Sequence, residues 1–248
     1  MSRVAQIIWT SIGVGMTAML FVAAIVSGYL MTPADSPCRS LEFVIKDGDE
    51  RMYLSESELI QLLKDENIYP VGVALNHASL HRIESAVRRH PMVRTAECYA
   101  TPDQDVKVEL TQRVPLLRVQ APAETYFIDT DRRQMPARNV VKDSVLVVTG
   151  TVGVQTAATQ LADFAEWLQE NKYWRNRIHH VHMRTPQMMV LYLRGEEQPR
   201  VVMGSIYRYK AKLAKLRVFF ENGAEAVGEN KYTELDVRYR GQVIGRKQ

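Results

Sequence analysis

The feature that most limits what this chain can fold into is an uncharged run near its N-terminus, from residue 4 to residue 34. A transmembrane helix needs about 20 predominantly apolar residues, whereas the apolar core of a cleaved signal peptide runs only about 7 to 15. The run is too long for a signal peptide, and Trp9 and Tyr29 fall near its ends, where interfacial aromatic side chains are favoured. It therefore predicts a transmembrane helix over residues 7–31 that contacts membrane lipid, after a short tail of residues 1–6.

The charge before this helix sets its expected orientation. Arg3 and the terminal amine precede the apolar run, and positively charged flanks favour the cytoplasmic side of a membrane. We therefore expect a single-pass membrane protein with its N-terminus cytoplasmic and its C-terminal part outside the cytoplasm.

The composition is that of a globular protein and gives no sign of a nucleic-acid partner. Hydrophobic residues make up 46% of the chain and charged residues 24%, which is typical of chains that bury a core. The net charge is +4, but Lys and Arg alternate with Asp and Glu along most of the sequence. The most basic segment, residues 208–217, interleaves Lys and Arg with Ala and Leu, which favours a solvated helix face.

Residues 32–39 form a linker, because two prolines and small polar residues neither continue a helix nor start a strand. After it, a capping box of Ser55 and Glu58 precedes a short amphipathic helix, and Pro91 closes a second one. The expected elements are a strand at 41–45, helices at about 55–63 and 78–89, and strands at 93–99 and 106–110. This order predicts a small α+β module over residues 40–112, with two helices covering one face of a three-stranded sheet.

Residues 113–248 show a different pattern, of short strands in series interrupted by two amphipathic helices. The helices are expected at about 157–171 and 207–220. The strands are expected at 116–119, 126–129, 145–148, 178–183, 188–193, 200–203, 232–239 and 242–244. This part of the chain therefore predicts a mixed β-sheet domain with flanking helices.

Several short segments, taken in order, point to a known family. They are His90 to Val93 with Ala96 to Tyr99, Val106 to Val108, Gln112 to Pro115, Tyr126 to Asp129 with Met135 and Pro136, Val147 to Gly150, and Lys231 to Tyr239 with Gly241 to Ile244. Their order and spacing resemble the FtsQ/DivIB family of bacterial cell-division proteins, and Bacteroidetes members most. The resemblance implies one membrane helix, a POTRA domain (β-α-α-β-β) over residues 40–112, and a β domain over residues 113–248.

The same resemblance implies a non-catalytic scaffold of the divisome that recruits and links subunits for septal peptidoglycan synthesis. It also implies a location in the cell inner membrane at the division septum, with the C-terminal domain periplasmic. The implied partners are membrane-anchored coiled-coil proteins of the FtsB/DivIC and FtsL types, with other divisome subunits bound through the POTRA domain. The partner-binding residues, carried over by position, are Tyr239, Gly241, Val243 and Ile244 on the C-terminal strand pair, with Arg184 less closely aligned. Core packing is the alternative for Val243 and Ile244. A last strand with unpaired edge groups could accept a strand or helix from a partner.

No set of side chains in the sequence indicates an enzyme, a metal or a cofactor. His180 and His182 would share one face of a strand and His179 the other, with no Cys, Asp or Glu near them to complete a zinc site. Asp129 and Asp131 could be paired carboxylates for acid and base chemistry, but their place beside a turn favours local backbone hydrogen bonds. No nucleophile lies in a recognisable catalytic context.

Two further points stay open on the sequence. Cys38 and Cys98 allow one disulfide without requiring it, and two separate thiols are the alternative. A POTRA-bearing chaperone or assembly factor for secreted or outer-membrane polypeptides is the alternative function. Such a transporter-linked protein is expected to continue into alternating strands of about ten residues, a pattern that this sequence does not show.

Overall fold

The computed structural model describes residues 16, 17, 19, 20, 22, 36–46, 54–137, 145–195, 198–222 and 232–247. The chain folds into two compact units. The first comprises Met1–Lys46, Ser55–Arg89 and Thr95–Leu110, and the second comprises Asp47–Leu54, His90–Arg94 and Thr111–Gln248. Each unit is described by itself.

The predicted transmembrane helix lies mostly outside the described residues, as do the tail 1–6 and most of the linker 32–39. The five described residues between Met16 and Val22 are helical and exposed. Among the residues that the structure describes, no helix has the length and hydropathy that a membrane crossing requires.

The first unit is a three-stranded sheet with two helices, as the sequence predicts. Its elements are β1 (Leu41–Ile45), α2 (Glu56–Asp65), α3 (Leu80–Arg89), β2 (Val93–Ala100) and β3 (Val106–Gln112). The strand order is β1-β3-β2, and β1 runs parallel to β3. Helix α2 begins where expected, because the Ser55 side chain accepts a hydrogen bond from the Glu58 N–H at 3.3 Å.

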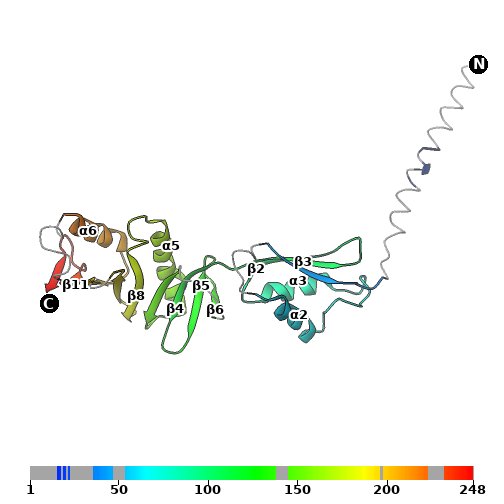
Figure 1. Cartoon of the computed structure of the whole chain (residues 1–248), viewed down its shortest axis with the longest axis horizontal. Coiled ribbons are helices and arrows are strands. Elements are labelled where there is room, and N and C mark those ends of the chain that lie inside the picture. Colours follow the sequence, from blue (N-terminus) through cyan, green and yellow to red (C-terminus); the bar gives the residue numbers. More distant parts are fainter. Residues whose placement is uncertain are drawn as a thin grey trace, which may run out of the picture. The chain divides into compact units, whose positions relative to one another are not determined.

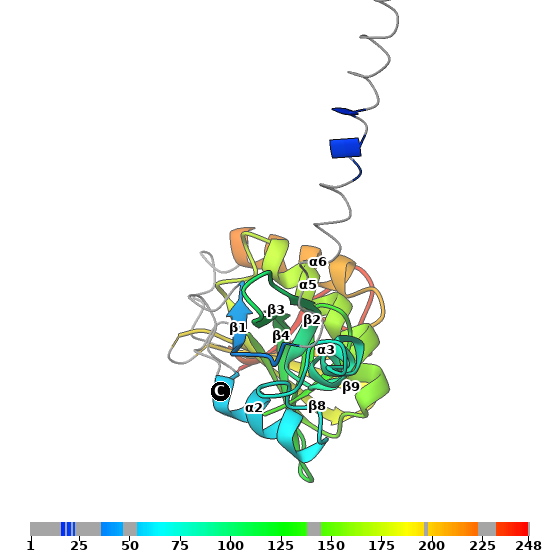
Figure 2. The same ribbon diagram turned by 90° about the vertical axis from the view of Figure 1, so that its right-hand side faces the viewer.

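Helices α2 and α3 lie side by side (Figures 1 and 2) and supply the apolar layer of this unit. Leu59 and Leu63 of α2 and Ile83 and Val87 of α3 are buried. In β3, buried residues alternate with half-buried ones, as in a strand with one face on a core. The helices therefore cover one face of the sheet.

The second unit is a single nine-stranded mixed sheet with its helices on one face. Its strands are β4 (Pro115–Gln120), β5 (Thr125–Asp129), β6 (Gln134–Pro136), β7 (Leu146–Gly150), β8 (Ile178–Thr185), β9 (Met188–Leu193), β10 (Arg200–Gly204), β11 (Tyr232–Asp236) and β12 (Ile244–Lys247). Their order across the sheet is β12-β11-β10-β9-β8-β7-β4-β5-β6. The pairs β4–β7, β7–β8 and β10–β11 are parallel, and the other pairs are antiparallel.

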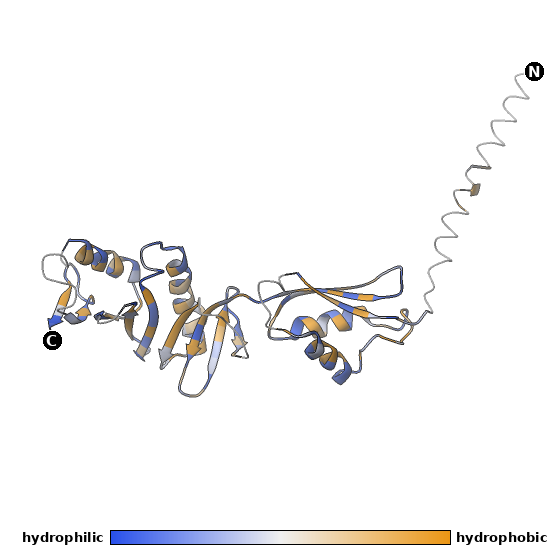
Figure 3. Cartoon of the chain, viewed as in Figure 1, coloured by the Kyte–Doolittle hydropathy of each residue, from blue (hydrophilic) through white to orange (hydrophobic). Residues whose placement is uncertain are grey.

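Two helical segments cover the same face of this sheet (Figure 1), and each has a hydrophobic and a hydrophilic side (Figure 3). The first is continuous through α4 (Val154–Thr156), a π-helical turn (Ala157–Leu161) and α5 (Ala162–Glu170), and the second is α6 (Tyr209–Asn222). The two segments meet through the rings of Phe164 and Tyr209, whose centroids are 5.1 Å apart.

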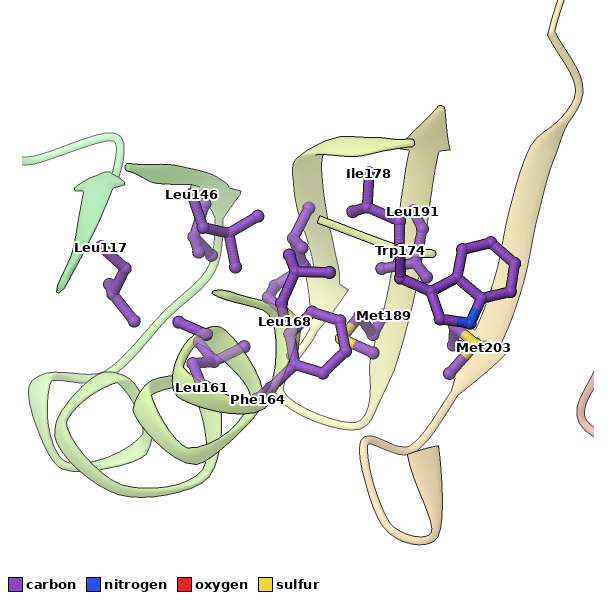
Figure 4. Packing of buried hydrophobic residues seen from close by; sticks show 14 of the residues in the cluster. Leu117, Leu146, Leu161, Phe164, Leu168, Trp174, Ile178, Met189, Leu191 and Met203 are labelled. Atoms are coloured by element: carbon purple, nitrogen blue, oxygen red, sulfur yellow. The ribbon is translucent and has the colours of Figure 1, made fainter. Parts of the chain in front are cut away.

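The core of the second unit lies between these helices and the sheet. Leu161, Phe164 and Leu168 point from the helix toward strand residues such as Leu146 and Leu191 (Figure 4). The aromatic ring of Trp174, which is 2% exposed, extends the core toward α6, where it lies 6.3 Å from the ring of Phe220. The opposite face of the sheet has no helix over it in the described part of the chain.

Candidate partner-binding edge

Strand β12 is one of the two edges of the nine-stranded sheet, as the sequence predicts for the last strand. It pairs with β11 alone, and all four of its residues are exposed. Its outer backbone groups have no neighbouring strand among the described residues. Such an edge can add a strand from another chain, because its free N–H and C=O groups continue the hydrogen-bonding ladder.

Gly245 lets β12 approach the helical face of the domain closely. A Cβ atom at this position would lie 2.4 Å from the ring of Tyr232. That ring in turn packs 6.0 Å from the ring of Phe219 on α6. The edge strand is therefore held by its backbone pairing and by one aromatic ring that lies over a glycine.

The prediction that the candidate residues all lie on the strand pair is wrong for three of the four. Tyr239 and Gly241 lie in the turn between β11 and β12, Val243 precedes β12, and only Ile244 belongs to a strand. Strand β11 ends at Asp236, where the Arg238 side chain turns back to bind the carboxylate with a shortest distance of 2.6 Å. Gly241 then adopts a φ of +73°, a conformation that other residues reach at a cost.

Exposure separates these four residues into two kinds. Tyr239 and Ile244 are 49% and 46% exposed, so neither is core. Val243 is half-buried and packs against the core cluster. For Val243 the alternative of core packing is therefore correct in part, and for Ile244 it is wrong.

A hollow of about 520 Å³ lies between this turn and the start of α6. Five basic residues line it, namely Arg208, Lys212, Lys215, Arg238 and Arg240, together with Tyr207 and Tyr239. No Asp or Glu lines the hollow. A positively charged hollow with two exposed tyrosines therefore adjoins the free edge of the sheet.

Two lysines of α6 bind backbone carbonyls beside this hollow, and one of them, Lys215, holds the turn. Lys212 Nζ donates to the carbonyl of Met203 at 3.0 Å, and Lys215 Nζ donates to the carbonyl of Val237 at 3.1 Å and to that of Tyr239. Partial burial lowers the pKa of Lys212, with neighbouring positive charges adding to the effect, and burial also lowers the pKa of Lys215. The expected solvated helix face is thus right for Lys210 and Arg217, which are exposed on α6, and wrong for these two lysines, which bind backbone. Arg208 is exposed but precedes the helix.

Asp236 supplies the compensating negative charge beside the hollow. Burial alone would raise the pKa of its carboxyl group, but hydrogen bonds from Arg238 outweigh that effect and hold the pKa below its usual range. The carboxylate therefore stays ionised and keeps the Arg238 side chain folded back on the end of β11.

Arg184 does not join the other four candidate residues. It is exposed near the end of β8, and three strands separate β8 from β12 in the sheet. Four strand spacings amount to about 19 Å. The structure thus brings Tyr239, Gly241, Val243 and Ile244 together and leaves Arg184 elsewhere.

The histidine cluster has the arrangement that a strand predicts. His180 Nε2 and His182 Nδ1 each lie 2.8 Å from the Thr149 hydroxyl, so both face the uncovered side of the sheet. The His180 ring stacks on Tyr192 with centroids 5.0 Å apart. The described residues contain no group of three or more His, Cys, Asp or Glu that could hold a metal ion.

The two candidate acid–base carboxylates have structural partners. Asp129 is 1% exposed, accepts a hydrogen bond from the Arg133 N–H at 2.6 Å, and forms an ion pair with Arg113 at 2.7 Å. Asp131 lies 4.0 Å from the same guanidinium. The interpretation as turn residues with local backbone hydrogen bonds is confirmed for Asp129.

The two cysteines are separate thiols. Neither Cys38 nor Cys98 is in a disulfide, and Cys38 Sγ donates to the carbonyl of Ser40 at 3.2 Å. Cys38 precedes β1 and Cys98 lies in β2, with β3 between these strands in the sheet. Burial raises the pKa of the Cys98 thiol to about 12, with negative charge from Glu84 adding to the effect.

Sequence reasoning missed Lys212, Lys215, Tyr232 and Gly245 as parts of this site. The two lysines could have been found, because residues three apart on a helix share a face, and Leu216 next to Lys215 marks the buried face. The contact between Tyr232 and Gly245 depends on the register of β11 and β12, which no local pattern reveals.

Comparison with known proteins adds a family to this geometry. Residues 114–246 match the family model described as "FtsQ/DivIB, C-terminal related", and residues 36–111 match a POTRA-like domain. No curated protein sequence matches the chain. A matching solved structure is the major extracytoplasmic domain of the trans isomer of the cell-division protein DivIB from Geobacillus stearothermophilus, at 13% identity and a TM-score of 0.30, covering 48% of this chain and 96% of that one.

Proposed function

Because the chain belongs to the FtsQ/DivIB family of bacterial cell-division proteins, we propose that it is a non-catalytic scaffold of the divisome. In this role it recruits and links other subunits for septal peptidoglycan synthesis. Its partners are the membrane-anchored coiled-coil division proteins of the FtsB/DivIC and FtsL types, and further divisome subunits bind its POTRA-like domain.

The observation that carries this proposal is the free edge at β12. All residues of this strand are exposed, and its outer backbone groups are available to a strand from a partner. Main-chain hydrogen bonds would supply affinity, and side chains at alternate positions would select the sequence. The adjoining basic hollow, with Tyr207 and Tyr239 at its surface, favours a partner segment that carries acidic groups.

The proposal includes a membrane anchor over residues 7–31, with the N-terminus in the cytoplasm and the two folded units in the periplasm at the division septum. Its support is the uncharged run from residue 4 to residue 34 in the sequence. A reporter that is active only in the cytoplasm, fused after Gln248, tests this topology. The expected result is an inactive reporter, and strong activity would indicate the opposite orientation.

Proline substitutions in β12 test the partner-binding edge. Successive residues of a strand direct their N–H groups alternately to the two sides. Of the neighbours Arg246 and Lys247, one N–H therefore faces β11 and the other faces outward. Proline removes the donor in each case. One of the two variants therefore loses an outward-facing N–H. We expect this variant to unfold like the wild type and yet to lose capture of the coiled-coil partners.

The other proline variant and Arg246→Ala serve as controls. Arg246→Ala keeps the backbone donor and removes an exposed side chain, so it should retain partner capture. Capture is measured by co-purification of the tagged full chain with the FtsB/DivIC-type and FtsL-type partners, and division is scored as cell length after complementation. Wild-type capture by both proline variants, with unchanged unfolding, would place the interface elsewhere.

A further inference from the structure

A second basic site lies at one end of the central strands, away from β12. Two adjoining hollows of about 510 and 630 Å³ open there and share Val145, His179 and Arg194. The first hollow reaches Arg118 and Phe127 on the uncovered face of the sheet. The second reaches Arg175 and residues of α5 on the helical face. The two hollows lie next to each other around the ends of β7, β8 and β9, and we call them together the arginine site.

The arginines of this site lack carboxylate partners within the described part of the chain. Arg118, Arg175 and Arg194 appear in no ion pair there, and neither hollow is lined by Asp or Glu. Elsewhere in the same unit, arginines such as Arg113 and Arg200 bind carboxylates at 2.7 and 2.8 Å. The site therefore concentrates positive charge that the described residues leave uncompensated.

The Arg118 side chain leaves part of its hydrogen-bonding capacity unused. Its Nε is buried and has no hydrogen-bond acceptor, while its guanidinium lies 5.9 Å from the centroid of the Phe127 ring. A buried donor without an acceptor destabilises the fold, and more so when it is charged. An oxyanion in the first hollow would offset the positive charge of this guanidinium.

The chemistry of the lining defines the ligand. Guanidinium groups bind carboxylates through two parallel hydrogen bonds. Phe127, Val147 and Leu193 add apolar walls beside Arg118 and Arg194. Each hollow has the volume of a small-ligand site, and the two share three lining residues. The site therefore suits a short chain with an apolar side chain and more than one acidic group.

We propose that this arginine site binds an acidic peptide segment of a partner protein, with carboxylates on Arg118 and Arg194 and an apolar side chain against Phe127. A nucleotide is disfavoured, because the lining offers no glycine-rich turn whose backbone N–H groups could surround phosphates. This binding would be independent of the β12 edge, so either site can fail its test without affecting the other.

The test uses the full chain in detergent micelles and two labelled peptides that differ only in charge, Glu-Phe-Glu-Glu and Gln-Phe-Gln-Gln. Fluorescence anisotropy should detect binding of the acidic peptide and at least tenfold weaker binding of its neutral counterpart. Arg118→Gln and Arg194→Gln should each weaken binding by about 10- to 100-fold, as expected for loss of a charged hydrogen bond. Arg82→Gln, on the exposed surface of α3, makes the same charge change elsewhere and should leave binding unaltered.

Two measurements keep the outcome decisive. A peptide with a photo-crosslinking phenylalanine analogue in place of Phe should label wild-type protein in β4, β5 or β9, whether or not the variants fold. Labelling elsewhere, or wild-type affinity in folded Arg118→Gln and Arg194→Gln, would overturn the proposal. Binding of inorganic phosphate through the same arginines, as tightly as the peptide, would replace it by a small-oxyanion site.

Discussion

The buried ion pair between Arg113 and Asp129 should be one of the most sensitive points of the second unit. The two side chains are 7% and 1% exposed, and Arg113 Nη1 lies 2.7 Å from Asp129 Oδ2. Arg113→Met would leave a buried carboxylate with the Arg133 N–H as its close hydrogen-bond donor. Removal of one partner from such a pair typically costs about 3–5 kcal/mol, because the remaining charge is buried without compensation.

The cost should fall when both charges are removed together. In Arg113→Met combined with Asp129→Asn, the amide oxygen can still accept from the Arg133 N–H, and no charge remains buried. We therefore expect the double variant to lose clearly less stability than the sum of the two single variants, which gives a coupling of at least about 1 kcal/mol. The matched control is Arg200→Met, which breaks a pair with Glu234 whose arginine is 43% exposed and should cost only about 0–1 kcal/mol.

Urea unfolding followed by tryptophan fluorescence measures these differences. Trp167 and Trp174 lie in the second unit, and Trp9→Phe in every variant leaves them as the only tryptophans, so the signal reports unfolding of that unit. A loss of less than about 1 kcal/mol in Arg113→Met, equal to that of Arg200→Met, would refute the argument from burial.

Three further results follow from individual side chains. Burial, and then the neighbouring charges of His179 and His182, lower the pKa of His180. Protonation of His180 therefore favours the unfolded state, so the stability to urea should fall as the pH drops below about 6.5. The same dependence of stability on pH in His180→Gln would contradict this. The raised pKa of Cys98, about 12, predicts that native protein reacts with iodoacetamide at this thiol far more slowly than urea-unfolded protein does, and equal rates would count against it. Phe164→Ala removes a ring that is 0% exposed and should lower the free energy of unfolding by about 3–5 kcal/mol, whereas Val218→Ala at an exposed position of α6 should change it little.

Local features of the sequence predicted most of the helices and strands, but few of the pairings between strands. The Ser55 cap, the alternating pattern of β3 and the apolar spacing of α5 are each set by residues a few positions apart, and the structure has all three. The order of the nine strands depends on contacts between distant segments, such as the parallel pairing of β10 with β11 across α6. Hydropathy shows that a strand is buried on one face, but not which strand lies beside it.

In the candidate site, too, some features could be predicted from the local sequence and others depend on contacts between distant segments. That the last strand forms an edge could be predicted, whereas its bounds could not, since Tyr239 and Val243 continue the alternation of a strand through a turn. The turn is fixed instead by the ion pair of Arg238 with Asp236 and by carbonyls that bind Lys215. The arginine site was missed altogether, because Arg118, Arg175 and Arg194 come from three segments that meet only in the folded sheet.

The exposure of β12 also determines how this end of the domain should move. Segments with few buried contacts open locally at much lower free energy than the core, which opens only with global unfolding. The amides of β12 should thus exchange with solvent before those of β9, whose side chains fill the core. A partner strand added to this edge would form hydrogen bonds with the outward-facing amides of β12, so that both sides of the strand would be paired. Slower hydrogen exchange at Ile244–Lys247 would then report occupancy of the edge directly, without any change elsewhere in the fold.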